Sequence, residues 1–156
     1  MTVKEKRIYL LILSVLVILA VTMVALYYHR VNQIAEALSG EESPIGLGYR
    51  CTTTESQLTE TQNGSIISLS KPFTHKIYDP SGELIAELET TFVGNIDTDS
   101  ASATSVNAAF TKEYRSGLTL SQHCSSDTGT VIVYSNQSCF YYFQYRISTN
   151  GTIELL

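Results

Sequence analysis

Ile8–Tyr28 reads IYLLILSVLVILAVTMVALYY, and this stretch decides how the chain is organised. It carries no charged side chain, and its only polar residues before the final tyrosines are Tyr9, Ser14 and Thr22. As an α-helix it would be about 31 Å long, which matches a membrane hydrocarbon core of about 30 Å. We therefore expect residues 8–28 to form a transmembrane helix.

Basic residues stand immediately before this stretch, at Lys4, Lys6 and Arg7. They predict that residues 1–7 lie in the cytoplasm and that the rest of the chain lies outside it. The apolar run is longer than the core of an ordinary signal peptide, and no A-x-A cleavage site follows it. We expect a retained signal anchor of a single-pass type II membrane protein. The alternative is cleavage of the stretch and secretion of the remainder.

Apolar residues continue past the span at helical spacing: Tyr27, Val31, Ile34 and Leu38. This pattern predicts that the helix runs out of the membrane to Ser39 and ends at Gly40. The stripe would either pack on the chain's own domain or mediate self-association as a short stalk. Residues 29–48 are accordingly predicted to be a helical stalk and a linker.

From Tyr49 onward the composition favours β-structure. Turn sequences at Asn63-Gly64, at residues 79–82 and at residues 149–151 predict three hairpins, each between apolar or β-branched runs. Residues 130–135 (TVIVYS) predict another strand, and residues 108–114 and 118–124 predict two more. We expect the chain to be mainly β, with residues 49–156 forming a small antiparallel β-sandwich or barrel-like domain.

Two segments of this domain need a choice between structures. Glu83–Phe92 has good helix propensity at its start, but the preceding turn and its β-branched, aromatic end favour a strand. Residues 94–107 are small and polar, and they predict a long loop. Asp97 and Asp99 lie in this loop at a spacing that could ligate calcium. No glycine at EF-hand spacing and no closing glutamate accompany them, so we expect a solvated loop rather than a calcium site.

Three cysteines, Cys51, Cys124 and Cys139, lie in the part expected outside the cytoplasm, where disulfides form. We predict a Cys124–Cys139 disulfide, which would close a loop of about 15 residues and stabilise the fold by about 3 kcal/mol. Cys51 would remain an odd thiol, either free or used between chains. The alternative is that all three thiols are reduced and buried.

Aromatic residues are densest at residues 139–146 (CFYYFQYR), and alternation places aromatic rings on both faces. This pattern predicts a central strand. Its tyrosines either pack in the core or stack on a sugar or a protein partner. Our candidate interaction surface therefore contains Tyr142 and Tyr145, together with Asp97 and Asp99. The two histidines of the domain, His75 and His123, are predicted to be surface residues.

The residues after Arg30 include six basic and fourteen acidic side chains, which gives a formal charge of about −8. Such a domain has no electrostatic attraction to nucleic acid. No nucleotide-binding, hydrolase or metal-site motif occurs in the sequence. We expect no cofactor and no catalytic residue.

Two family resemblances follow from these features. An apolar helix that continues into an antiparallel sheet with a late cysteine pair resembles type IV pilins, which implies a structural subunit. The pilin processing glycine and the glutamate inside the apolar helix are missing here. Leu118–Cys124, LTLSQHC, resembles the TLxTC motif of sortases with one extra residue. That resemblance implies a cysteine transpeptidase that uses Cys124, an upstream histidine, here His75, and a downstream arginine. The next arginine, Arg146, lies much further along the chain than the family's arginine.

The function that these features favour is a membrane-anchored, extracytoplasmic, non-catalytic binding module whose partner is a surface protein or a glycan. A pilin-like structural subunit is the alternative, and a sortase-like enzyme ranks third. Self-association through Tyr27, Val31, Ile34 and Leu38 is a further expectation.

Overall fold

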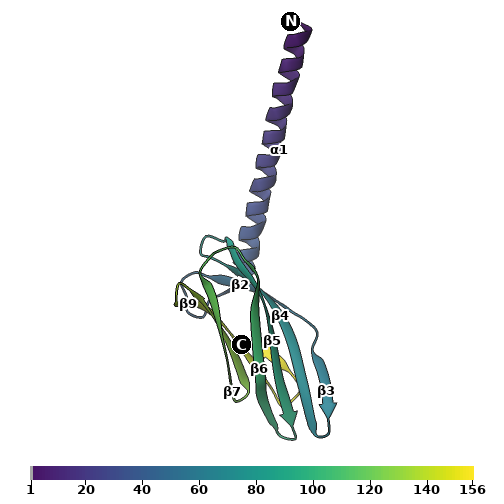
Figure 1. Ribbon diagram of the computed structural model, residues 1–156, viewed down its shortest axis with the longest axis vertical. Coiled ribbons are helices and arrows are strands. Elements are labelled where there is room, and N and C mark those ends of the chain that lie inside the picture. Colours follow the sequence, from purple (N-terminus) through teal and green to yellow (C-terminus); the bar gives the residue numbers. More distant parts are fainter. Residues whose placement is uncertain (1) are drawn as a thin grey trace.

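The computed structural model describes residues 2–156 and contains one long helix followed by a β domain (Figure 1). The helix, α1, spans Val3–Ser39 and projects away from the domain. The domain consists of two antiparallel sheets of six and four strands. The predicted fold class, an N-terminal apolar helix followed by a small antiparallel β domain, is confirmed.

The helix begins in a capping box and ends where the sequence predicts. The Thr2 side chain accepts a hydrogen bond from the backbone N–H of Glu5, and the Glu5 carboxylate accepts one from the N–H of Thr2. At the other end Gly40 has a φ of −75°, so its backbone is not left-handed. Glycine is needed there for a different reason, because a Cβ would lie 2.7 Å from the carbonyl oxygen of Cys51.

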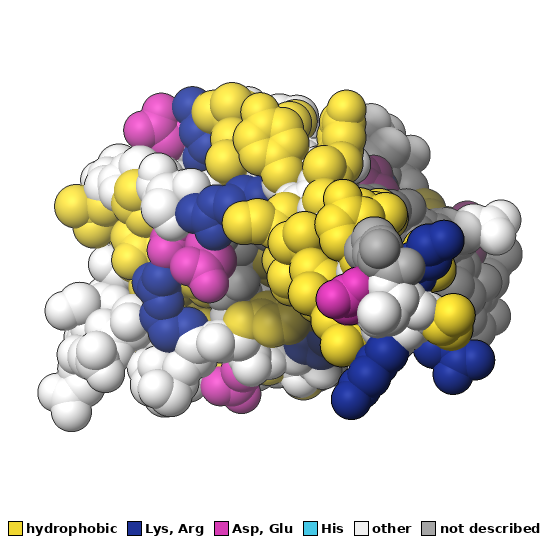
Figure 2. Space-filling view, turned by 90° about the horizontal axis from the view of Figure 1, so that it is seen from above, with side chains coloured by type: hydrophobic (Ala, Val, Ile, Leu, Met, Phe, Trp, Pro, Cys, Tyr) yellow, Lys and Arg dark blue, Asp and Glu magenta, His cyan; other side chains and the backbone are white. Residues whose placement is uncertain are grey.

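The apolar part of α1 has the length and hydropathy of a membrane span or of a signal sequence. Its side chains contact no other part of the chain, and residues 3–32 are exposed. Seen from above in Figure 2, hydrophobic side chains gather on one large area of this end of the molecule, with Lys and Arg side chains around it. Such an exposed apolar surface is consistent with a membrane anchor or a signal sequence.

The end of α1 is the part that contacts the domain. Ala37 is buried, and Ile34 lies where a Cβ on Gly82 would be 3.2 Å from its Cγ1 atom. Glu36 forms an ion pair with Lys76 at 2.9 Å. The Arg50 guanidinium donates to the carbonyl oxygens of Leu38 and Gly40, which compensates for the missing partners at the end of a helix.

The predicted apolar stripe is therefore divided. Ile34 is partly buried at the domain, whereas Tyr27, Val31 and Leu38 remain exposed, with Leu38 at 65%. Packing on the chain's own domain accounts for one of the four positions. Self-association through the other three stays a prediction.

The six-stranded sheet runs in the order β1-β2-β4-β5-β6, with β3 also paired to β4. Because β2 pairs with the second half of β4 and β3 with the first half, the two short strands share one edge of the sheet. The strands are β1 (Glu41–Glu42), β2 (Arg50–Glu55), β3 (Thr59–Asn63), β4 (Ile66–Tyr78), β5 (Leu84–Asp97) and β6 (Ser100–Glu113).

The four-stranded sheet runs in the order β10-β9-β8-β7, so β9 lies between two neighbours as predicted for the aromatic strand. The β6–β7 side of the domain is tied together by the Ala103 N–H, which donates to the Ser126 carbonyl oxygen. The strands are β7 (Leu118–Ser125), β8 (Thr128–Ser135), β9 (Ser138–Ile147) and β10 (Ile153–Leu155).

The three predicted hairpins form at β3–β4, β4–β5 and β9–β10. Gly64 in the first turn and Gly151 in the last have φ values of +63° and +87°, which other residues rarely adopt. Residues 84–92 form a strand, as predicted, and Ala86, Leu88, Thr90 and Phe92 are buried on one side of it.

The predicted loop over residues 94–107 is wrong. These residues belong to one long hairpin in which β5 and β6 pair from Ala86–Glu113 out to Asp97–Ser100. The turn itself is confined to Asp97–Ser100, where Thr98 has a φ of +51°. Small residues there predicted a loop, but Ala101 and Ala103 pack against the core and the ladder pairs the backbone along its length.

The core lies between the two sheets and is mainly aromatic and β-branched. Gly129 on β8 belongs to this packing, because a Cβ there would be 2.6 Å from the Phe92 ring and 3.2 Å from Val106. The absence of a side chain thus lets β8 approach β5. Fully buried members of the core are Phe73, Ile77, Leu88, Phe92, Val131, Val133 and Tyr145.

Gly129→Ala should lower the free energy of unfolding by about 1–3 kcal/mol, because the new methyl group overpacks a buried ring. Denaturant unfolding of the full chain in detergent micelles measures the change. Thr119→Ala, at an exposed position on neighbouring β7, is the control and should have little effect. Equal stability of the glycine variant and the parent would contradict the packing described here.

Candidate functional site

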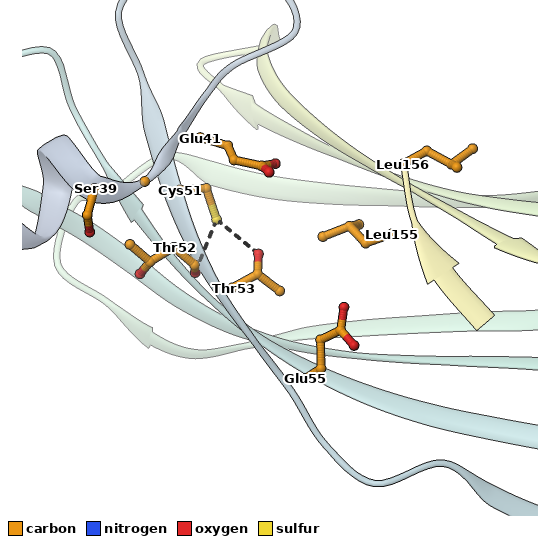
Figure 3. Close-up of a pocket in the computed structure, with 9 residues that line it drawn as sticks. Ser39, Glu41, Cys51, Thr52, Thr53, Glu55, Leu155 and Leu156 are labelled. Atoms are coloured by element: carbon orange, nitrogen blue, oxygen red, sulfur yellow. Dashed lines mark hydrogen bonds between the residues drawn. The ribbon is translucent and has the colours of Figure 1, made fainter. Parts of the chain in front are cut away.

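A cleft of about 470 Å³ opens at the foot of α1, between the edge of the six-stranded sheet and β10 (Figure 3). Its upper end is formed by Ser39 and Gly40, where the helix meets β1. The carboxylates of Glu41 and Glu55 point into it, and the thiol of Cys51 and the hydroxyl of Thr53 lie beside them (Figure 3). Leu155 and Leu156 form the opposite wall.

Behind the cleft lies a buried polar network centred on His75. The Thr53 hydroxyl is 2.8 Å from the His75 Nδ1 atom, and the Tyr145 hydroxyl is 2.8 Å from its Nε2 atom. Thr90 approaches the same nitrogen at 3.1 Å and the Tyr145 hydroxyl at 2.6 Å. The imidazole also stacks on the Phe143 ring at 4.0 Å. Each buried polar atom of the ring thus has a partner.

The prediction that His75 is a surface residue is wrong. Its side chain is fully buried, because on β4 it shares the inward face with Phe73 and Ile77. Alternation along FTHKIY contains this signal, since residues 73, 75 and 77 must face the same way. His123 is exposed, as predicted.

Burial determines the protonation states of the His75 imidazole and the Cys51 thiol. Desolvation lowers the pKa of His75 to about 3, so the imidazole is neutral at physiological pH. Desolvation also raises the pKa of Cys51 to about 12, so this thiol keeps its proton. The Cys51 Sγ atom lies 3.9 Å from the Thr53 hydroxyl. An activated cysteine needs a depressed pKa, and Cys51 has the opposite.

The predicted Cys124–Cys139 disulfide is wrong: all three cysteines are free thiols. Cys124 is paired with Gly129 at one end of β8, and Cys139 is paired with Tyr134, five positions further along. Five strand positions correspond to about 17 Å, whereas bridged cysteines have Cα atoms within about 7 Å. The sequence separation suited a loop, but the residues between them form an extended strand.

The predicted interaction surface is not one surface. Tyr145 is fully buried in the His75 network, which corrects its assignment to the surface. Tyr142 on the opposite face of β9 is half-buried and lines a hollow beside the cleft. Asp97 and Asp99 are exposed at the tip of the β5–β6 hairpin, away from α1 (Figure 1). Alternation explains the split, because Tyr142 and Tyr145 point to different faces.

The groups that a sortase-like reaction would use are not in hydrogen-bonding contact. The polar partners of His75 are Thr53, Thr90 and Tyr145, and the Arg146 guanidinium lies beside Asp127. Burial raises the pKa of Cys124 as well. Within residues 2–156 the side chains of His, Cys, Asp and Glu form no group of three that could hold a metal ion.

Comparisons with protein-family models, with curated proteins and with solved structures gave no match. The chemistry of the site therefore has to be judged from its own geometry. That geometry gives an acidic cleft at a sheet edge, backed by a neutral histidine and a protonated thiol.

Acidification should destabilise the chain through His75. Its folded pKa lies below that of an unfolded histidine, so the unfolded state binds more protons between about pH 6.5 and pH 3. The free energy of unfolding should fall as the pH falls through this range, by up to about 1.4 kcal/mol per pH unit. Denaturant unfolding in detergent micelles at several pH values measures the slope.

The matched variant is His75→Gln, which keeps hydrogen-bonding groups but does not titrate in this range. Its slope should be shallower than that of the parent, and equal slopes would contradict the assignment. If the variant does not fold, NMR of the imidazole in the parent decides the point, since the His75 ring should stay neutral at pH values well below 6.5, the ordinary pKa of a histidine.

Proposed function

We propose that the chain is a single-pass membrane protein whose β domain lies outside the cytoplasm and acts as a non-catalytic binding module. The observation that carries the proposal is α1 itself. One uninterrupted helix joins the apolar stretch to the domain and touches the domain near its C-terminal end. The domain is thereby held at the membrane while both sheets and the cleft remain open to partners.

The orientation rests on Lys4, Lys6 and Arg7, which precede the apolar stretch and favour a cytoplasmic N-terminus. Secretion after cleavage is the alternative, because a signal sequence has the same length and hydropathy. Continuity of the helix up to its contact with the domain favours retention. Ile34, Glu36 and Ala37 make contacts that belong to the intact chain.

A binding role rather than catalysis is supported by the chemistry of the cleft. Glu41 and Glu55 supply its carboxyl groups, whereas His75 and Cys51 are held neutral by burial. An acid–base reaction needs a group whose pKa lies near the working pH, in contact with the reacting atoms. An exposed, polar domain of this kind would bind a surface protein or a glycan.

A pilin-like structural subunit is the second candidate, and the continuous helix favours it. The same assembly would need α1 to lie along a sheet, whereas α1 extends away from the domain (Figure 1). The binding module is therefore the function that we put forward.

Orientation can be tested with the chain's own thiols. A membrane-impermeant maleimide should label intact cells at Cys124 and Cys139, which are partly exposed, and spare Cys51, which is 3% exposed. Replacing Cys124 and Cys139 by serine should abolish the signal. Labelling that appears only after the cells are permeabilised would place the domain in the cytoplasm.

Partner binding can be tested by site-specific photo-crosslinking in cells that make the full chain. The crosslinking residue replaces Glu41 in the cleft, Asp99 at the hairpin tip, or Thr104 on the outer face of β6. We expect a discrete adduct from at least one position, unchanged when all three cysteines are serine. Absence of adducts, together with His75-dependent labelling of Cys124 by a thioester substrate probe, would favour an enzyme.

A further inference from the structure

On the side of β2 opposite β4, a neighbouring strand is present along only part of its length; we call this strand position the column next to β2. β1 pairs Glu41 with Cys51 and Glu42 with Arg50. At Gly40 the chain leaves the column and turns into α1, so β1 does not continue alongside the rest of β2. The cleft is the vacant continuation of this column, bounded by β2 on one side and by β10 on the other (Figure 3).

The register shows which backbone groups of β2 face the vacancy. The Ser56 N–H donates to the Pro72 carbonyl oxygen, so even-numbered residues of β2 are hydrogen-bonded to β4. The Ser43 N–H donates to the Tyr49 carbonyl oxygen, so odd-numbered residues face the column of β1. In an antiparallel strand these two directions alternate. Thr53 and Glu55 therefore direct N–H and C=O groups into the cleft.

The same argument applies to β10. The Leu156 N–H donates to the Gln144 carbonyl oxygen, which places the even-numbered residues of β10 against β9. Ile153 and Leu155 consequently face away from β9. The Ile153 carbonyl oxygen already accepts a hydrogen bond from Lys71 at 3.2 Å. The Leu155 backbone remains directed towards the cleft.

We propose that this cleft binds a short extended segment of a cationic partner protein by strand addition, antiparallel to β2 and in line with β1. Unpaired edge groups are a template for such pairing, and main-chain hydrogen bonds supply the affinity. The inference rests on the binding function proposed above and specifies its partner.

The negative charge of the cleft and of the domain favours a basic segment as the bound strand. Glu41 and Glu55 point into the cleft, and Glu42 lines the adjoining hollow. Lys71 is the cation at this position, and it is already paired with Glu55. The part of the chain after Arg30 carries about −8, so it attracts a basic segment over distances of about 10 Å and repels an acidic one. A second copy of this acidic domain is disfavoured for the same reason.

The test uses the full chain in nanodiscs and a displayed library of random ten-residue peptides. Selection should enrich peptides that are net basic and alternate in side-chain size. For the best enriched peptide, hydrogen exchange measured by NMR should show new protection of the amides of Thr53, Glu55 and Leu155. Failure of any peptide to enrich, or protection elsewhere without protection of these amides, overturns the proposal.

Two matched variants make the test specific. Glu55→Pro removes an outward-facing N–H in the cleft while leaving the β2–β4 hydrogen bonds in place. Glu60→Pro makes the same change on β3, outside the cleft. Thr59 is paired with Ser70 and Thr61 with Ser68, which leaves the N–H of Glu60 directed to the outer edge of the sheet. The first should weaken peptide binding at least tenfold, and the second should leave it unchanged. Equal loss in both overturns the proposal.

Failure here and failure of the binding function are distinguishable. A photo-crosslinked partner at Asp99, combined with no peptide at the cleft, would refute strand addition and leave a binding module that uses its hairpin tip. Enrichment of acidic peptides as strongly as basic ones would refute the choice of a cationic partner.

Discussion

The close contact between Gly40 and the carbonyl group of Cys51 is the constraint on which the rest of the structure depends. At Gly40 the chain passes from α1 to the extended strand β1 within one residue. A side chain on residue 40 would collide with the β2 backbone. Arg50, the neighbour of Cys51, binds the last carbonyl oxygens of the helix. Because the helix leaves here, β1 is short, the column beside β2 is vacant and a cleft exists at the foot of α1.

The second organising feature is the hydroxyl network around His75. A histidine among Phe73, Phe143 and Tyr145 would be costly without hydrogen bonds, and Thr53, Thr90 and Tyr145 supply them from three strands. The network connects β2, β4 and β5 of one sheet to β9 of the other. Burial keeps the imidazole neutral, so the group most suited to acid–base chemistry serves the packing of the two sheets.

Local signals predicted the elements well where they did not depend on distant contacts. The helix end, the three hairpin turns and the strand over residues 84–92 follow from glycine placement, turn residues and alternation. The prediction for residues 94–107 failed because small polar residues resemble a loop. Only the pairing of residues 94–97 with β4 and β6, and of residues 100–107 with β5, makes these segments strands. The Cys124–Cys139 disulfide failed because loop length carries no information about the strand between the two residues.

The candidate site shows the same division. Glu41, Cys51, Glu55 and Leu155 come from distant parts of the sequence, and no spacing among them indicates a common cleft. By itself the sequence determined the apolar helix, its continuation to Ser39, the β character of the domain and its negative charge, because composition and local periodicity are properties of single segments. Tertiary structure alone decided the hydroxyl partners of His75, the separation of the cysteines and the vacant column beside β2. Those features depend on which strands become neighbours, and pairing partners are chosen by the packing of the whole domain.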